Sequence, residues 1–143
     1  MLTIMGLDAE QEHELRILIQ RVSRRIRVER GANVSDTQLG VLGHLHREGP
    51  TTPGELAALE RVSPPSMNRT INALAEAGRV RRDPSPDDAR KVLVSITEGG
   101  EELILETKRL RSAWFHARLD ELGTDDLDAL AAVLPVLRRL ADS

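Results

Sequence analysis

Apolar residues recur every three or four positions along most of this 143-residue chain, which is the spacing of amphipathic helices. The stripe of Leu15, Leu18, Val22 and Ile26 predicts a first helix over residues 8–30. The same spacing predicts five more helices, over residues 35–49, 52–61, 63–77, 98–122 and 124–141. Four of them open with a residue type that caps helix N-termini, namely Ser35, Thr52, Ser63 and Thr97.

Between residues 80 and 96 the spacing of apolar residues changes from the helical repeat to the alternation of β-strands. Residues 80–82 predict a short strand, and residues 91–96 alternate with Val92, Val94 and Ile96 on one face. The intervening Asp-Pro-Ser-Pro-Asp-Asp-Ala is rich in turn formers, so the two strands are expected to form a hairpin with a long, charged tip. The predicted fold class is mainly α with a small β-hairpin (α+β), in a single domain over residues 1–143.

Composition narrows the class of protein. Apolar residues make up 40% and charged residues 30%, which is typical of a folded soluble chain, and no apolar run reaches the roughly 20 residues of a membrane span. The N-terminus carries no signal-peptide pattern and the chain has no cysteine, so we expect a cytoplasmic protein without disulfides. Trp114 and Phe115 are the only aromatic residues, which argues against a protein that binds single strands by base stacking.

Charge is unevenly distributed along a chain whose net charge is only −3. Residues 16–30 carry six arginines against Glu29, and residues 61–91 carry seven basic residues against four acidic ones. This pattern favours one basic face that binds a polyanion, although solvated helix faces give the same pattern.

Two short helices, 52–61 and 63–77, joined by a tight turn and followed by a hairpin, are typical of a winged helix-turn-helix. On helix 63–77, Met67, Ile71 and Leu74 share one face and are expected to be buried. The opposite face carries side chains that hydrogen-bond base edges in a major groove, since arginine suits guanine and asparagine suits adenine. This face holds Pro65, Arg69, Asn72 and Glu76, with Ser66 and Ala73 flanking it and Asn68 to one side.

The hairpin carries basic residues on both strands. Arg90 lies just after the tip, and an arginine on a projecting ribbon suits a narrow minor groove. Asp88, two residues earlier, is placed to pair with Arg90 and fix its direction. The alternative is that these charges only protect an edge strand from aggregation.

Three segments resemble the MarR (multiple antibiotic resistance regulator) family of winged helix-turn-helix transcription factors. They are TPGELA at 52–57, SPPSMNRTINAL at 63–74, and DARKVLVSITEGG at 88–100. The resemblance implies a homodimer with dimerisation helices at 8–30 and 98–141 and a DNA-binding lobe at 35–97. It also implies a repressor on a palindromic operator in double-stranded DNA, released by a small apolar or phenolic anion.

By this resemblance Arg69 reads bases in the major groove and Arg90 enters the minor groove. Ala89 stands where the family often has a second basic residue, and the absent cysteines exclude the thiol switch of some members. The predicted DNA-binding residues are Ser63, Pro65, Ser66, Asn68, Arg69, Asn72, Arg81, Arg82, Asp88, Arg90 and Lys91.

Other candidate sites are weaker. Trp114 and Phe115, with Arg16 supplying charge, are candidates for an effector cavity between the dimer body and the DNA-binding lobe. Packing in the core or in the dimer interface is the simpler explanation of the two rings. His44 and His46 are two apart on a helix and diverge, so no metal site is expected.

No catalytic or cofactor-binding motif is present in the sequence, so we expect neither an enzyme nor a cofactor. The alternatives are a winged-helix protein-interaction module that does not bind DNA, and a constitutive DNA binder without an effector. DNA binding that weakens steeply with salt would distinguish the regulator from the protein-interaction module.

Overall fold

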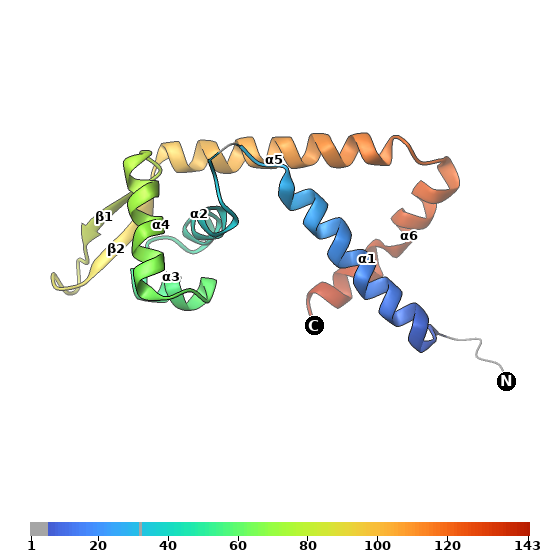
Figure 1. The fold of residues 1–143 in the computed structure, drawn as a ribbon, viewed down its shortest axis with the longest axis horizontal. Helices are drawn as coiled ribbons and strands as arrows, with labels where there is room; N and C mark the ends of the chain where they lie inside the picture. Colours follow the sequence, from blue (N-terminus) through green and yellow to red (C-terminus); the bar gives the residue numbers. More distant parts are fainter. Residues whose placement is uncertain (1–5, 32) are drawn as a thin grey trace. The chain divides into compact units, whose positions relative to one another are not determined.

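The computed structural model describes residues 6–31 and 33–143 of the chain. Two parts of the chain lie outside the described residues. One is residues 1–5, which hold most of the N-terminal segment in which we found no signal-peptide pattern. The other is Ala32, near the expected end of the first helix. The described elements are six helices and one two-stranded antiparallel hairpin (Figure 1). Their order is α1 (Ala9–Val28), α2 (Asp36–Glu48), α3 (Pro53–Glu60), α4 (Pro64–Glu76), β1 (Val80–Pro84), β2 (Val92–Ile96), α5 (Glu98–Leu119) and α6 (Thr124–Ala141). The predicted fold class and element order are confirmed.

The helix starts follow the predicted capping residues. Ser35 and Gln38 form a reciprocal capping box, in which each side chain accepts a hydrogen bond at 3.1 Å from the backbone N–H of the other. Thr52 Oγ1 accepts from the Glu55 N–H at 3.2 Å, and Ser63 Oγ accepts from the Ser66 N–H at 3.2 Å. These local bonds satisfy N–H groups that have no partner within the helix.

The chain divides into two compact units, one formed by residues 27–109 and the other by residues 6–26 and 110–143. The first unit holds the hydrophobic core. The predicted inner face of α4 is confirmed, because Met67 and Ile71 are fully buried and Leu74 is 1% exposed. These side chains pack in one cluster with residues of α2, α3 and both strands, namely Val41, Leu42, Leu45, Leu56, Ala57, Val80 and Val94.

The hairpin is longer than predicted, because β1 continues through Asp83 to Pro84 before the chain turns. Its register pairs Val80 with Ile96 and Pro84 with Val92. Proline is tolerated at the end of an edge strand, where its missing N–H breaks no ladder bond. Val92 is 41% exposed while Val94 is fully buried, so the face that carries the alternating apolar residues is covered by the core at Val94 and open to solvent at the tip end of the strand.

The base of the hairpin is bonded on both sides. Val94 pairs with Arg82 in β1 and also with Thr51, in the connection between α2 and α3. Thr51 N–H donates to Val94 O at 3.1 Å, and Val94 N–H donates to Thr51 O at 2.9 Å. The hairpin therefore leaves the core from a fixed base.

The second unit consists of helical segments with little internal core. Neither α1 nor α6, both fully described, contains a buried residue. Helix α5 ends at Leu119, three residues before the predicted end, with i to i+3 bonds from Glu121 and Leu122 closing its last turn. Among the described helices, none is long and apolar enough to cross a membrane.

Candidate nucleic-acid interface

The exposed face of α4 presents the side chains predicted to contact DNA. Ser63 caps the helix and Pro64 and Pro65 occupy its first turn. Pro65, Asn68, Arg69 and Asn72 are exposed and Ser66 is half-buried, on the side away from the buried face. Because α4 is fixed by three buried residues, its outward side is fixed as well.

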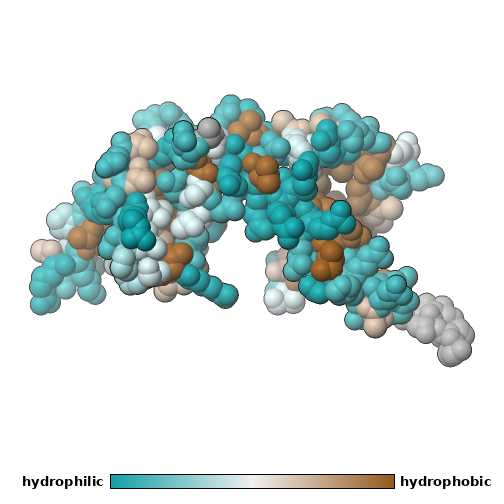
Figure 2. All heavy atoms as spheres, viewed as in Figure 1, coloured by the Kyte–Doolittle hydropathy of each residue, from teal (hydrophilic) through white to brown (hydrophobic). Residues whose placement is uncertain are grey.

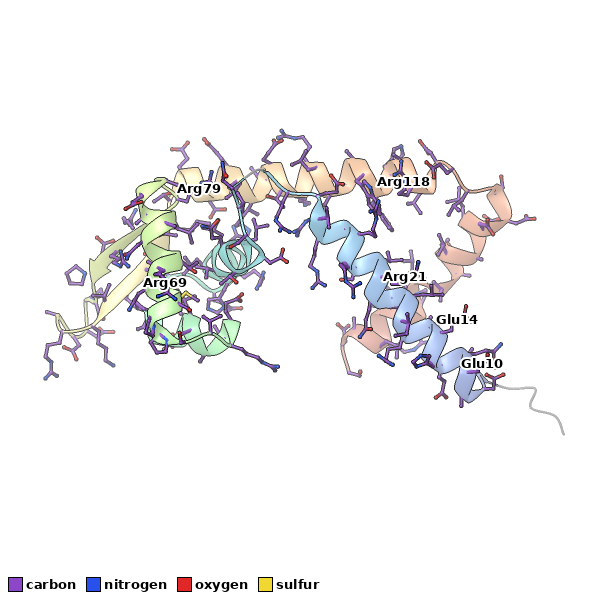
Figure 3. All side chains as sticks on the ribbon, in the orientation of Figure 1. Glu10, Glu14, Arg21, Arg69, Arg79 and Arg118 are labelled. Atoms are coloured by element: carbon purple, nitrogen blue, oxygen red, sulfur yellow. The ribbon has the colours of Figure 1, made fainter. Side chains whose placement is uncertain are left out.

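Arg69 lies on α4 within reach of the first turn of its own helix (Figure 3). Its Nη2 donates to Ser66 Oγ at 3.0 Å, and the Ser66 N–H is in turn bonded to the Ser63 cap. The guanidinium keeps further N–H groups for another acceptor. The capping network therefore also holds the side chain that we expect to read bases.

Asn72 is tied to the hairpin, which the sequence did not indicate. Arg82 Nη2 in β1 donates to Asn72 Oδ1 in α4 at 2.7 Å. With its oxygen engaged, the Asn72 amide presents its NH₂ group to a ligand. The adenine pairing expected from sequence needs both the oxygen and the NH₂ of asparagine, so this contact favours donation to a base acceptor instead.

The tip of the hairpin holds Arg90 by a local pair with Asp88, as the sequence predicted. Asp88 Oδ1 accepts from Arg90 Nε at 3.1 Å and from the Arg90 backbone N–H at 3.0 Å. The side-chain and backbone hydrogen bonds from Arg90 lower the pKa of the Asp88 carboxyl below its ordinary value of 3.8. The Arg90 side chain is 90% exposed, and Asp88 is the partner that the described residues give it.

The remaining predicted residues of the hairpin lie along its exposed surface. Arg81 Nε donates to Asp83 Oδ2 at 2.8 Å, which partly offsets its charge. The Lys91 side chain is exposed, and the Lys91 N–H donates to Asp88 O at 2.9 Å and helps to close the tip. The structure thus gathers basic side chains on the hairpin of the same unit that holds α4.

The turn between α3 and α4 contains a feature that was missed in the sequence. Arg61 has a positive φ of 56°, in the left-handed region that glycine adopts most readily. The turn of a helix-turn-helix often contains a glycine. The absence of a glycine between the two predicted helices, with Arg61 in the turn, is the sequence signal that could have indicated a left-handed non-glycine residue here.

The predicted effector residues are only partly brought together. A pocket of about 380 Å³ in the second unit is lined by Trp114 with Leu18, Arg21, Val22, Arg24 and Arg25. Arg25 and Arg118 lie over the Trp114 ring, 5.4 and 5.6 Å from its centroid. Phe115 stacks beside Trp114 at 6.5 Å but does not line the pocket, and Arg16 bonds His13 instead.

His46, weighed above as a metal ligand, hydrogen-bonds Glu101 at 2.6 Å. Within the described residues, no three histidine, cysteine or acidic side chains are grouped to hold a metal ion.

A two-helix motif whose second helix has a polar outward face with Arg69, followed by a basic hairpin, defines a winged helix-turn-helix DNA-binding protein. The MarR family model matches residues 34–92, which span α2 to the start of β2. An HTH-type transcriptional regulator of Mycobacterium tuberculosis is 41% identical over 140 residues, covering 97% of this chain and 98% of that protein. A second HTH-type regulator, from Bacillus subtilis, is 30% identical and covers 82% of this chain and 78% of that protein.

Solved structures agree with this match. A putative transcriptional regulator from Pseudomonas aeruginosa superposes with a TM-score of 0.78 at 28% identity, covering 97% of this chain and 99% of that one. Wild-type MarR of E. coli, in its apo form, gives a TM-score of 0.66 at 25% identity, covering 94% and 98%. The chain belongs to the MarR family: it is a DNA-binding transcriptional regulator and not an enzyme.

The Asp88–Arg90 pair predicts how the Asp88 carboxyl titrates and over which pH range the pair persists. We expect the Asp88 carboxyl to titrate below the ordinary aspartate range, and Arg90→Ala to raise this pKa towards the ordinary value by removing the side-chain hydrogen bond. Because the folded pKa is lowered, the pair is present above the ordinary pKa and is lost only as pH falls through the lowered value. The conformation of the β1–β2 hairpin tip should therefore not change between about pH 5 and 8.

Titration of the Asp88 carboxyl carbon by NMR measures this pKa directly. Lys91→Ala is the control, since it removes a neighbouring positive charge but neither hydrogen bond, and it should leave the Asp88 pKa lowered. An unchanged Asp88 pKa in Arg90→Ala would mean that the pair does not form in solution.

Proposed function

We propose that the chain is a homodimeric repressor that binds a two-fold symmetric operator, with α4 in the major groove and the β1–β2 hairpin in the minor groove. The observation that carries the proposal is the placement of Arg69 and Arg90. Both are exposed, both are oriented by a bond to a neighbouring side chain, and they lie on the two elements that a winged helix-turn-helix uses for DNA.

Helix α4 suits major-groove recognition because its outward face is polar and its inward face is locked in the core. A guanidinium oriented by Ser66 can donate two hydrogen bonds to guanine O6 and N7, while the Asn72 NH₂ donates to a neighbouring base acceptor. Ser63, Pro65 and Asn68 complete the face that approaches the groove. The arrangement supports sequence-specific binding.

The hairpin suits the minor groove because Asp88 directs one exposed arginine from its tip. A narrow A·T-rich groove has the most negative potential and attracts such a side chain. Arg81, Arg82 and Lys91 are placed nearer the base of the hairpin or beside the tip, where phosphates are the expected partners. The hairpin thus adds shape recognition to the base contacts of α4.

Arginine substitutions test this assignment. Arg69→Ala should cost about 1–3 kcal/mol of binding free energy per half-site and relax the preference at one base pair. Arg90→Ala should weaken binding chiefly at A·T-rich flanks and reduce the salt dependence of the affinity. Fluorescence anisotropy with DNA from upstream of the protein's own gene, a scrambled duplex and a salt titration measures both effects.

Arg109→Ala is the matched control, because it removes one exposed arginine of α5 whose partner among the described residues is Glu106. Wild-type affinity and selectivity in both the Arg69 and Arg90 variants would show that the recognition assignment is wrong. Absence of DNA binding by the wild-type protein even at low salt would favour the protein-interaction alternative.

Dimerisation is supported by the apolar surface of the second unit. Helices α1 and α6 bury none of their residues within the described chain, yet both carry continuous apolar stripes. Figure 2 shows apolar side chains at the surface along α1. The exposed fractions run from 38% to 55% over Leu15, Leu18, Ile19, Val22, Leu127, Leu130, Leu134, Val136, Leu137 and Leu140. A surface of this kind is typical of a protein–protein interface.

Sedimentation tests the dimer. The wild-type chain of 15.8 kDa should sediment as a dimer at micromolar concentration. The half-sites of its operator should then lie about one helical turn, or a small multiple of one turn, apart. Leu134→Glu with Leu137→Glu should give monomers, because each places a charge in the apolar stripe of α6. Leu59→Glu, at an equally exposed leucine of α3, is the control and should remain dimeric. A wild-type monomer would overturn the proposal.

Release by an apolar anion is supported by the pocket beside Trp114. Its volume suits a small ligand, and its lining combines an indole ring and aliphatic side chains with three arginines. An anion that binds the DNA-incompetent form more tightly by about 1.4 kcal/mol lowers DNA affinity tenfold. The residues that supply charge are then Arg21, Arg24 and Arg25 in place of Arg16.

Titration with salicylate should change Trp114 fluorescence and lower operator affinity together. Arg25→Gln should weaken both responses, since Arg25 lines the pocket and lies over the indole ring. Arg16→Gln is the matched control and should leave them unchanged. A flat response up to millimolar salicylate would contradict release by this anion and favour a constitutive DNA binder.

A further inference from the structure

Arg61 occupies a backbone position that glycine usually takes. It follows the last residue of α3, with its N–H donating to Ala58 O at 3.3 Å, while the Val62 N–H donates to Ala57 O at 3.1 Å. This pair of bonds is the Schellman motif, whose left-handed residue is most often glycine because a Cβ is strained there. The turn therefore retains an arginine at a place where glycine would be more stable.

The guanidinium of Arg61 makes no compensating contact within the described structure. The residue is exposed, and among the described residues its side chain has no hydrogen bond, ion pair or ring contact. The interface arginines at 69, 81, 82 and 90 are all bonded to neighbouring side chains. Nothing in residues 6–31 and 33–143 accounts for an arginine at residue 61.

The helix that follows lacks the backbone donors that usually contact a DNA phosphate. Helix α4 begins with Pro64 and Pro65, neither of which has an N–H, and the Ser66 N–H is bonded to Ser63 Oγ. The first three residues of α4 therefore offer no free N–H, and at this end of the helix only the N–H of the N-cap Ser63 remains of the kind that holds anions at other helix N-termini. Beyond that single N–H, a phosphate at this end of α4 is bound by side-chain donors.

We propose that Arg61 contacts the DNA phosphate backbone and replaces the missing amide donors of α4. This inference rests on the proposed placement of α4 in the major groove, which brings the α3–α4 turn to the edge of that groove. The contact positions the protein on the duplex without reading sequence. The strained backbone is retained because the position serves DNA binding.

The substitution Arg61→Gly separates a binding role from a structural one. It should raise the melting midpoint by roughly 2–5 °C, because glycine relieves the left-handed strain. It should also weaken DNA binding roughly five- to tenfold at about 0.1 M salt, and lower the slope of log affinity against log salt by about 0.9 per subunit. Arg61→Lys should keep most of the slope without the gain in stability.

Two duplexes distinguish the contact from base recognition. One is a labelled duplex that the wild-type protein selects from a random-sequence pool, and the other is a mixed-sequence duplex of the same length. Arg61→Gly should weaken both by the same factor, whereas Arg69→Ala should weaken the selected duplex more. Asn33→Gly is the backbone control: Asn33 is the other described non-glycine residue with positive φ, at 65°, and its substitution should leave DNA binding unchanged.

The outcomes separate the two proposals. Wild-type DNA affinity and salt slope in Arg61→Gly, together with a loss in Arg69→Ala, would overturn the role of Arg61 alone. A lowered melting midpoint in Arg61→Gly would show that the arginine is structural and would also overturn it. Failure of the wild-type protein to select any duplex would instead contradict the proposed function.

Discussion

Burial of one face of α4 determines what the DNA-binding unit presents to its surroundings. Met67 and Ile71 are fully buried, and Leu74 is nearly so, against residues of α2, α3 and the hairpin. A rotation of α4 by one residue would expose part of this face and move Arg69 or Asn72 toward the core. An unpaired guanidinium in an apolar core is far too costly, so the orientation of the outward face follows from the packing of the inward one.

Short hydrogen bonds then set the directions of the long side chains on that surface. Arg69 is held by Ser66, Arg82 by Asn72 and Arg90 by Asp88. Exposed pairs of this kind contribute little to folding stability. They do restrict the rotamers of flexible side chains, which lowers the entropy lost when those side chains are ordered on a ligand. Their value is in preorganisation.

The features that could be predicted from sequence are those that depend on near neighbours in the chain. The caps at Ser35, Thr52 and Ser63 act over three residues, and the Asp88–Arg90 pair acts over two, so both were accessible. The buried face of α4 follows from helical spacing alone. These local rules were sufficient for the fold class and for most of the candidate interface.

The remainder depends on where separate elements meet. The Arg82–Asn72 bond joins a strand to a helix, and its existence depends on the register of the hairpin against α4. Exposure of Val92 depends on how far the strand extends past the core, which alternation does not encode. Arginine rarely adopts the left-handed backbone conformation that Arg61 has, so backbone propensity alone does not predict it. Phe115 and Arg16 are close in sequence to residues that line the pocket, yet neither of them is part of its lining. Which residues line it depends on which face of each helix meets the other.

The two-sided pairing of Val94 has a consequence for how this regulator can evolve. Val94 is bonded to β1 and to Thr51, so the base of the hairpin belongs to the framework of the unit. Beyond it, the bonds among residues 85–91 are confined to the tip itself. Insertions, deletions and exchanges at the tip therefore leave the framework intact, as is usual for exposed loop tips. A lineage can vary the length and charge of this segment while it inherits the core and the helix caps without change.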